Sequence, residues 1–170
     1  MNIPNEDGYE LWLRYRRVDN TERLAQYRKA LGSVVVLGES ATTEIIRSEL
    51  ARALPALLDA DVPLSAQLPD SHALVVGTAD ALEVAGVTLP QAQRDAVGEE
   101  GFLIRTHPAG THTWTVVTGN AETAVLTGVF HFLRLLQTHQ DIGELDIASW
   151  PRIRRRIHAH WDNLDGSIER

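Results

Sequence analysis

The chain has 170 residues, of which 44% are hydrophobic and 23% charged, and its net charge is -7. This length can bury one sizeable core, and the composition is typical of a globular protein. The negative charge argues against nucleic acid as a partner, because binding to phosphates needs a concentration of Lys and Arg. The absence of cysteine excludes disulfides and thiolate chemistry.

No run of about 18 apolar residues is present, so no membrane span is predicted. Residues 1–7 lack the basic and then apolar pattern of a signal peptide. The predicted location is cytoplasmic. The alternative is a periplasmic or secreted protein from which a leader has been removed.

Alternation of apolar and polar residues predicts a first strand over residues 9–18. Thr21 is then expected to cap a helix over 22–31. A β-branched run at 34–37 is typical of a fully buried strand, and a helix over about 43–58 follows it. The apolar stripe of this second helix consists of Ile46, Leu50, Ala53, Leu54 and Leu57.

The order of strand, Gly38 and helix invites comparison with a phosphate-binding loop. Neither the three-glycine dinucleotide spacing nor a Gly-Lys-Ser/Thr ending is present in residues 38–43. A Ser or Thr that caps the helix explains these residues, and we favour that interpretation.

The second half of the chain continues with a buried strand at 73–77 and short helical pieces within 79–98. Two further strands at 101–106 and 113–118 flank a loop that contains Pro and Gly, which indicates a hairpin.

Asn120 is expected to cap the most apolar helix, over 121–138, and residues 145–147 are predicted to form an edge strand. The predicted fold class is α+β: an α/β sandwich with a mixed sheet of about four or five strands and two long helices on one face.

The end of the chain alternates again over residues 153–162, which predicts a strand, and residues 163–166 form a turn signal. A strand tip that carries His, Trp, Asp and Asn places polar groups and an aromatic face at a loop mouth. In parallel barrels, active sites lie at such mouths.

Three blocks of sequence resemble the bacterial and fungal α-glucuronidases of glycoside hydrolase family 67. His160–Arg170 resembles the opening of their catalytic barrel, while Glu6–Tyr15 and Phe130–Thr138 resemble their amino-terminal domain. One departure is Ala159, where the family pattern has Asn. The resemblance implies an amino-terminal domain at 1–150 and a truncated start of the (β/α)8 barrel at 151–170. A whole barrel takes about 250 residues, so the catalytic carboxylates are expected beyond Arg170.

The resemblance further implies an inverting hydrolysis of the α-1,2 bond that releases (4-O-methyl)-D-glucuronic acid from xylo-oligosaccharides, without metal or cofactor. Its partners would be the catalytic barrel of the same enzyme and the glucuronoxylo-oligosaccharide substrate, and a homodimer of the full-length enzyme is left open. Trp161, His160, Asp162 and Asn163 are the predicted substrate-binding residues, and this fragment alone is expected to be inactive. From the residues alone, Trp161 could instead pack internally.

Other candidate side chains receive structural interpretations. His158, His160 and Asp162 share a face, but zinc needs three or four converging ligands with supporting partners. His131 is expected to be a core residue, and Trp12, Trp114 and Trp150 are expected to pack. The alternative function is a free-standing carbohydrate-binding or interaction module, which would need an exposed aromatic platform.

Overall fold

The computed structural model describes residues 14–153 and residue 157. Its centre is a six-stranded sheet in the order β2-β1-β3-β5-β4-β6. Neighbours β2, β1, β3 and β5 are parallel, whereas β4 is antiparallel to both β5 and β6. The strands are β1 (Val34–Val36), β2 (Leu64–Ser65), β3 (Ala73–Thr78), β4 (Phe102–Ala109), β5 (His112–Gly119) and β6 (Asp146–Ser149).

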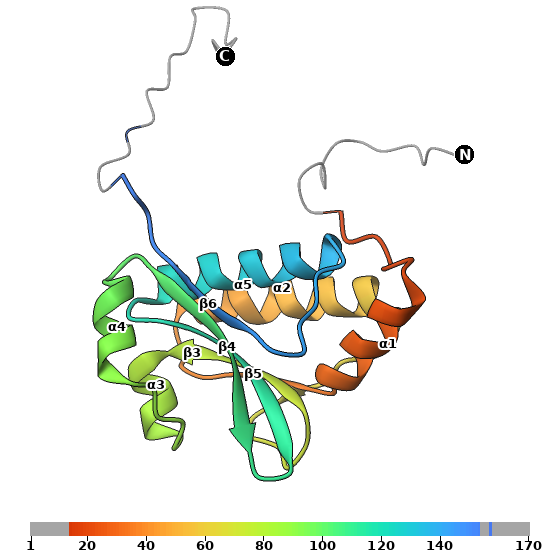
Figure 1. Cartoon of the computed structure of the whole chain (residues 1–170), viewed down its shortest axis with the longest axis horizontal. Coiled ribbons are helices and arrows are strands. Elements are labelled where there is room, and N and C mark those ends of the chain that lie inside the picture. The colour runs from red at the N-terminus through yellow and green to blue at the C-terminus, as the bar shows by residue number, and fades with distance from the viewer. Residues whose placement is uncertain (1–13, 154–156, 158–170) are drawn as a thin grey trace, which may run out of the picture.

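Two long helices lie side by side on one face of the sheet (Figure 1). These are α2 (Ala41–Leu58) and α5 (Glu122–Gln137), with the shorter α1 (Thr21–Ala30) beside them. The opposite side carries α3 (Ala79–Val84) and α4 (Gln91–Val97). The predicted α+β class, mixed sheet and pair of long helices on one face are therefore confirmed.

The alternation of side chains along the central strands explains the two cores. On β3, Leu74 and Val76 join the large core under α1, α2 and α5, while Ala73 and Val75 join a smaller core under α3. The whole predicted stripe of α2 is at most 1% exposed, as its helical period requires. Both faces of the sheet thus bury apolar side chains, which explains the continuous apolar runs at β1 and β3.

Several local predictions need correction. No strand forms over residues 14–18, and residues 9–13 of the predicted first strand lie outside the described residues. Asn20, rather than Thr21, caps α1, because its Oδ1 accepts a hydrogen bond of 3.0 Å from the Arg23 N–H. The hairpin strands are longer than expected, since β4 and β5 pair as far as Ala109 and His112.

The helix predicted at 121–138 is confirmed, but its cap is not. Ala121 occupies the cap position without a side-chain hydrogen bond, and Asn120 points elsewhere.

The sheet also has one more strand than the upper expectation of five, because the two-residue β2 pairs with β1. Among the helices that the structure describes, none has the length and apolar character needed to cross a membrane.

Candidate functional site

The predicted substrate-binding residues His160, Trp161, Asp162 and Asn163 lie outside the described residues, as do His158 and Ala159. Their placement therefore stays a prediction, and so does the division of the chain at residue 150. The described part of the chain nevertheless contains a surface hollow directly before this segment.

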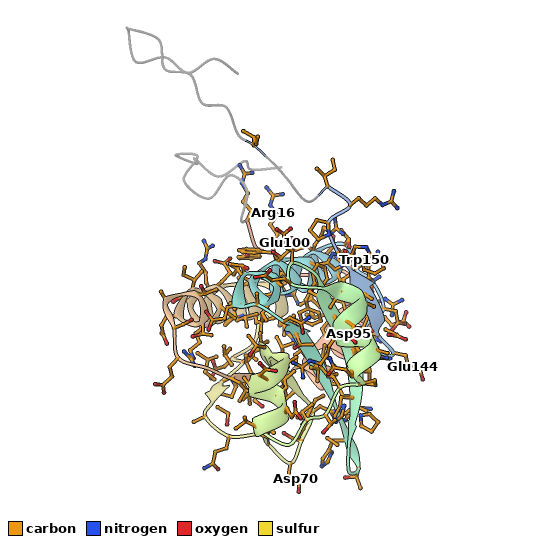
Figure 2. The ribbon with its side chains drawn as sticks, turned by 90° about the vertical axis from the view of Figure 1, so that its left-hand side faces the viewer. Arg16, Asp70, Asp95, Glu100, Glu144 and Trp150 are labelled. Atoms are coloured by element: carbon orange, nitrogen blue, oxygen red, sulfur yellow. The ribbon has the colours of Figure 1, made fainter. Side chains whose placement is uncertain are left out.

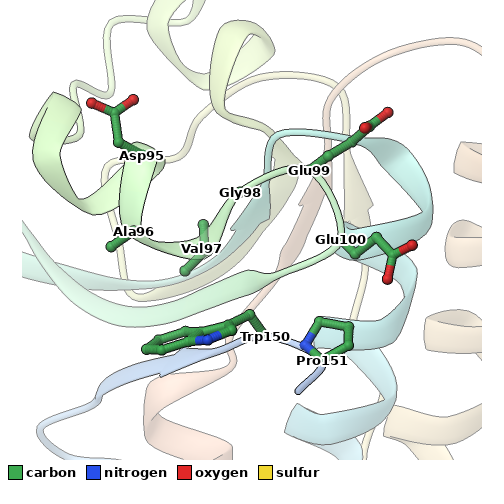
Figure 3. Close-up of a pocket in the computed structure, with 8 residues that line it drawn as sticks. All are labelled: Asp95, Ala96, Val97, Gly98, Glu99, Glu100, Trp150 and Pro151. Carbon is green, nitrogen blue, oxygen red and sulfur yellow. The ribbon is translucent and has the colours of Figure 1, made fainter. Parts of the chain in front are cut away.

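The hollow has a volume of about 470 Å³ and lies between the end of α4 and the end of β6 (Figure 3). We call it the Trp150 hollow; it is lined by Asp95, Ala96, Val97, Gly98, Glu99, Glu100, Trp150 and Pro151. Trp150 is 53% exposed, so the prediction that this side chain packs internally is wrong. After the edge strand β6, the chain continues through Trp150 and Pro151, which form one wall of the hollow.

Trp114 behaves as predicted. It is half-buried, its Nε1–H donates a 3.1 Å hydrogen bond to the Ser71 carbonyl, and its ring stacks on His107 at 6.2 Å between centroids. Trp12 lies outside the described residues.

Gly101 sets the shape of the Trp150 hollow. A Cβ atom at this position would lie 2.3 Å from the Val97 carbonyl oxygen, 2.8 Å from that of Ser149 and 2.9 Å from Cβ of Trp150. Only glycine lets the start of β4 approach β6 and Trp150 this closely. The sequence offered no signal that distinguished this glycine from those in turns.

Asn120 holds the other wall of the hollow. Its amide Nδ2 donates hydrogen bonds of 2.9 Å to the Arg94 carbonyl and 2.8 Å to the Gly98 carbonyl. These bonds tie the end of α4 to the loop before α5. Arg94 in turn forms ion pairs with Asp80 and with Glu83, the latter at 3.2 Å, so α4 is also fixed to α3.

The charged groups around the Trp150 hollow are acidic. Asp95 lies on the opposite side of the hollow from Glu99 and Glu100, and the three carboxylates do not converge (Figure 3). An adjoining hollow of about 220 Å³ shares Trp150 with this one and has Arg152 among its own lining residues. This arrangement offers one aromatic side chain and acceptor oxygens, but no pair of carboxyl groups that face a common point.

A second position of interest lies at the ends of β1 and β3, where a phosphate-binding loop would sit. Ser40 caps α2, with its Oγ accepting from the Thr43 N–H at 3.1 Å, so the capping interpretation is confirmed. The space between the strand ends measures only about 10 Å³, which is room for one water molecule at most and too small for a phosphate group. The carboxylate of Glu122 lies against Ser40, which places a negative charge where an anion would bind.

The interpretation of His131 also changes. This residue is half-buried at the margin of the core rather than within it, and its ring lies 5.2 Å from that of the buried Phe102. Burial and the nearby Arg134 lower its pKa. Within residues 14–153, no three His, Cys, Asp or Glu side chains gather as metal ligands.

Comparison with known proteins identifies the domain. The family model described as "Glycosyl hydrolase family 67 N-terminus" matches residues 11–132. The chain belongs to glycosyl hydrolase family 67. The predicted family resemblance is therefore confirmed over most of the chain.

Curated relatives align along nearly the whole chain. Alpha-glucuronidase A of Aspergillus tubingensis is 27% identical over 176 residues, which is 99% of this chain and 19% of the relative. Alpha-glucuronidase of Hypocrea jecorina is 26% identical over 178 residues, covering 97% of this chain and 20% of the relative. The chain thus spans about a fifth of the length of these relatives.

A solved structure described as a family GH115 4-O-methyl-alpha-glucuronidase, BtGH115A, with specificity for decorated arabinogalactans, is similar to part of this family 67 domain. The match has a TM-score of 0.47 and 20% identity, and it covers 63% of this chain and 14% of that one.

Proposed function

We propose that this family 67 chain is the amino-terminal, non-catalytic domain, with the first barrel strand, of an α-glucuronidase. The parent enzyme would hydrolyse the α-1,2 bond and release (4-O-methyl)-D-glucuronic acid from xylo-oligosaccharides. The observation that carries the proposal is the family match at residues 11–132, together with relatives named alpha-glucuronidase that align along 97–99% of the chain.

The chemistry of the described residues supports a non-catalytic role. An inverting glycosidase needs a protonated carboxyl group and a carboxylate about 6.5–9.5 Å apart on opposite faces of the sugar. The carboxylates of the Trp150 hollow do not converge on one point, and no Arg or Lys lines that hollow to receive an anionic sugar. We therefore assign both catalytic carboxyl groups, and the cations that bind glucuronate, to residues beyond Arg170.

Within this chain we assign substrate contact to His160, Trp161, Asp162 and Asn163 at the tip of the first barrel strand. The Trp161 indole would offer the sugar an apolar face and one N–H donor. The side chains of Asp162 and Asn163 would shape the pocket rim rather than act as acid or base.

An assay of the polypeptide extended through the whole barrel tests this assignment. Incubation with a purified 4-O-methyl-glucuronoxylo-oligosaccharide should release the uronic acid, and NMR should first detect the β-anomer, as inversion requires. Trp161→Ala in that polypeptide should raise KM, with Trp114→Phe as the matched control. Release of a neutral sugar, or of the α-anomer first, would argue against the proposed reaction.

We also propose that the enzyme acts in the cytoplasm and needs no cofactor, and we keep a homodimer of the full-length enzyme as a candidate state. Cell fractionation with an antibody to this domain tests the compartment, and enrichment in a periplasmic or culture fraction would reverse that assignment. Sedimentation of the full-length protein tests the dimer.

A second candidate, a carbohydrate-binding module, gains support from one observation: the 53% exposure of Trp150 supplies the aromatic surface that such a module needs. Titration of the 170-residue chain with xylo-oligosaccharides separates the two functions. Binding at millimolar concentration or tighter, lost in Trp150→Ala, would favour the module.

A further inference from the structure

We propose that the Trp150 hollow is a docking face for the part of the same polypeptide that follows residue 157. This inference deepens the proposed function and rests on it, because the docking part would be the catalytic portion of the enzyme. The occupant is expected to insert an apolar side chain beside Trp150 and to present Arg or Lys to Asp95 and Glu99 at the rim of the hollow.

The first argument is the concentration of exposed apolar side chains where the chain leaves the sheet. Trp150, Ile153 and Ile157 are 53%, 67% and 84% exposed, and they follow one another within eight residues. The other large exposed apolar residues come singly from separate elements: Ile45 from α2, Leu64 from β2, Val84 from α3 and Phe130 from α5. Scattered exposed residues are ordinary, whereas a concentration of them indicates a surface that a partner covers.

The second argument is the edge strand that leads into the hollow. In the part of the chain that the structure describes, β6 pairs on one side only, with β4. An edge strand exposes backbone N–H and C=O groups that another segment can pair with or cover. Trp150 directly follows the last residue of β6, so its exposed ring lies at the end of this open edge.

The third argument is that the hollow is fixed in shape. The close approach at Gly101 and the two hydrogen bonds from Asn120 hold its opposite walls. A surface that is already ordered loses little entropy when a partner binds. The fixed shape of the hollow is therefore typical of the core of an interface rather than of a loosely packed chain end.

Tethering and charge decide which partner fits. Trp150 and Pro151 line the hollow and also lead into the part of the chain that follows. A short linker therefore holds that part near the hollow at an effective concentration in the millimolar range. The exposed carboxylates of Asp95 and Glu99 favour a basic surface on that partner. A free oligosaccharide or a second copy of the chain would have to compete with this tethered segment.

Residue-resolved hydroxyl-radical footprinting tests the proposal. The 170-residue chain and the full-length polypeptide are labelled side by side, and the modification of Trp150 is read by mass spectrometry. Docking should reduce Trp150 labelling by about tenfold in the full-length protein, since the core of an interface excludes solvent. Val84, which is 91% exposed on α3, serves as the internal control and should be labelled equally in both.

Charge reversal supplies a second test. Glu99→Lys in the full-length protein should restore part of the Trp150 labelling, whereas Glu144→Lys should not, since Glu144 is also exposed but lies away from the hollow near the other end of β6 (Figure 2). Neither substitution should change the unfolding of the 170-residue chain. Unchanged unfolding would show that the effect on Trp150 labelling arises from docking.

The outcomes separate this inference from the proposed function. Equal labelling of Trp150 in both proteins overturns the docking face, even if the full-length protein releases glucuronic acid. Protection of Trp150 in a full-length protein that does not release glucuronic acid would retain the docking face and reject the function. Protection that depends on the concentration of the 170-residue chain, or on added xylo-oligosaccharide, would replace the tethered occupant by a second copy or a sugar and overturn the proposal.

Discussion

The Ser40 hydroxyl group donates a hydrogen bond of 2.7 Å to Oε2 of Glu122 and so joins the first turn of α2 to that of α5. The same Oγ accepts from the Thr43 N–H, and the Thr43 hydroxyl accepts from the Ser40 N–H at 2.7 Å. One side chain thus caps one helix and positions a carboxylate at the start of the other, where the helix dipole favours negative charge.

Ser40→Ala is expected to lower the free energy of unfolding by about 1–2 kcal/mol, because it removes a helix cap and leaves Glu122 without this donor. Urea unfolding of the 170-residue chain measures the change. Ser65→Ala is the matched control, since the Ser65 hydroxyl at the end of β2 forms only local hydrogen bonds among the described residues: it donates to the Gln67 carbonyl and accepts from the Gln67 N–H. Equal effects of the two substitutions would show that the link between α2 and α5 contributes nothing.

Gly101→Ala should be more damaging than an alanine substitution at Gly86. The added methyl at Gly101 meets three backbone or Cβ atoms closer than 3.0 Å, so the start of β4 must move away from the end of α4 and from β6, at a cost of about 3 kcal/mol. Gly86 has a φ of +86° but open space around it, so alanine there costs only about 1–2 kcal/mol of backbone strain. Urea midpoints of the two variants check this order, and the reverse order would disprove the close approach at Trp150.

The carboxyl group of Asp141 should titrate well below the usual range. Hydrogen bonds from the Gly143 N–H, Gln26 and Arg23 lower its pKa from 3.8 to about 2. Because the folded-state pKa lies below the unfolded one, the stability that Asp141 contributes is complete above about pH 4 and is lost as the pH falls towards 2. Thermal unfolding of the wild type and Asp141→Asn should therefore differ at neutral pH and converge near pH 2; a constant difference would refute the shift.

The helices and strands with a clear pattern of apolar residues could be predicted from the sequence. The stripes of α2 and α5 and the β-branched runs of β1 and β3 need burial in any arrangement of the chain, so pattern alone located them. The two-residue β2 is too short to carry a pattern and exists because β1 offers an edge.

The predictions that failed depended on tertiary contacts. Asn120 precedes a helix and fits the statistics of a cap, but its amide bonds to Arg94 and Gly98 across space instead. Trp150 was expected to pack because the tryptophans do not have the spacing of a sugar platform, yet β6 is an edge strand and leaves the ring half exposed. No local signal connects Gly101 with Trp150, so the hollow became visible only in three dimensions (Figure 3).

The most direct test measures release of glucuronic acid from a 4-O-methyl-glucuronoxylo-oligosaccharide by two proteins at equal molar concentration. One is the 170-residue chain, and the other is the same chain extended through the complete barrel. We expect no release above background from the first and catalytic turnover by the second. Turnover by the 170-residue chain would contradict the assignment of the catalytic carboxylates to residues beyond Arg170, and inactivity of a folded extended protein would contradict the proposed enzyme.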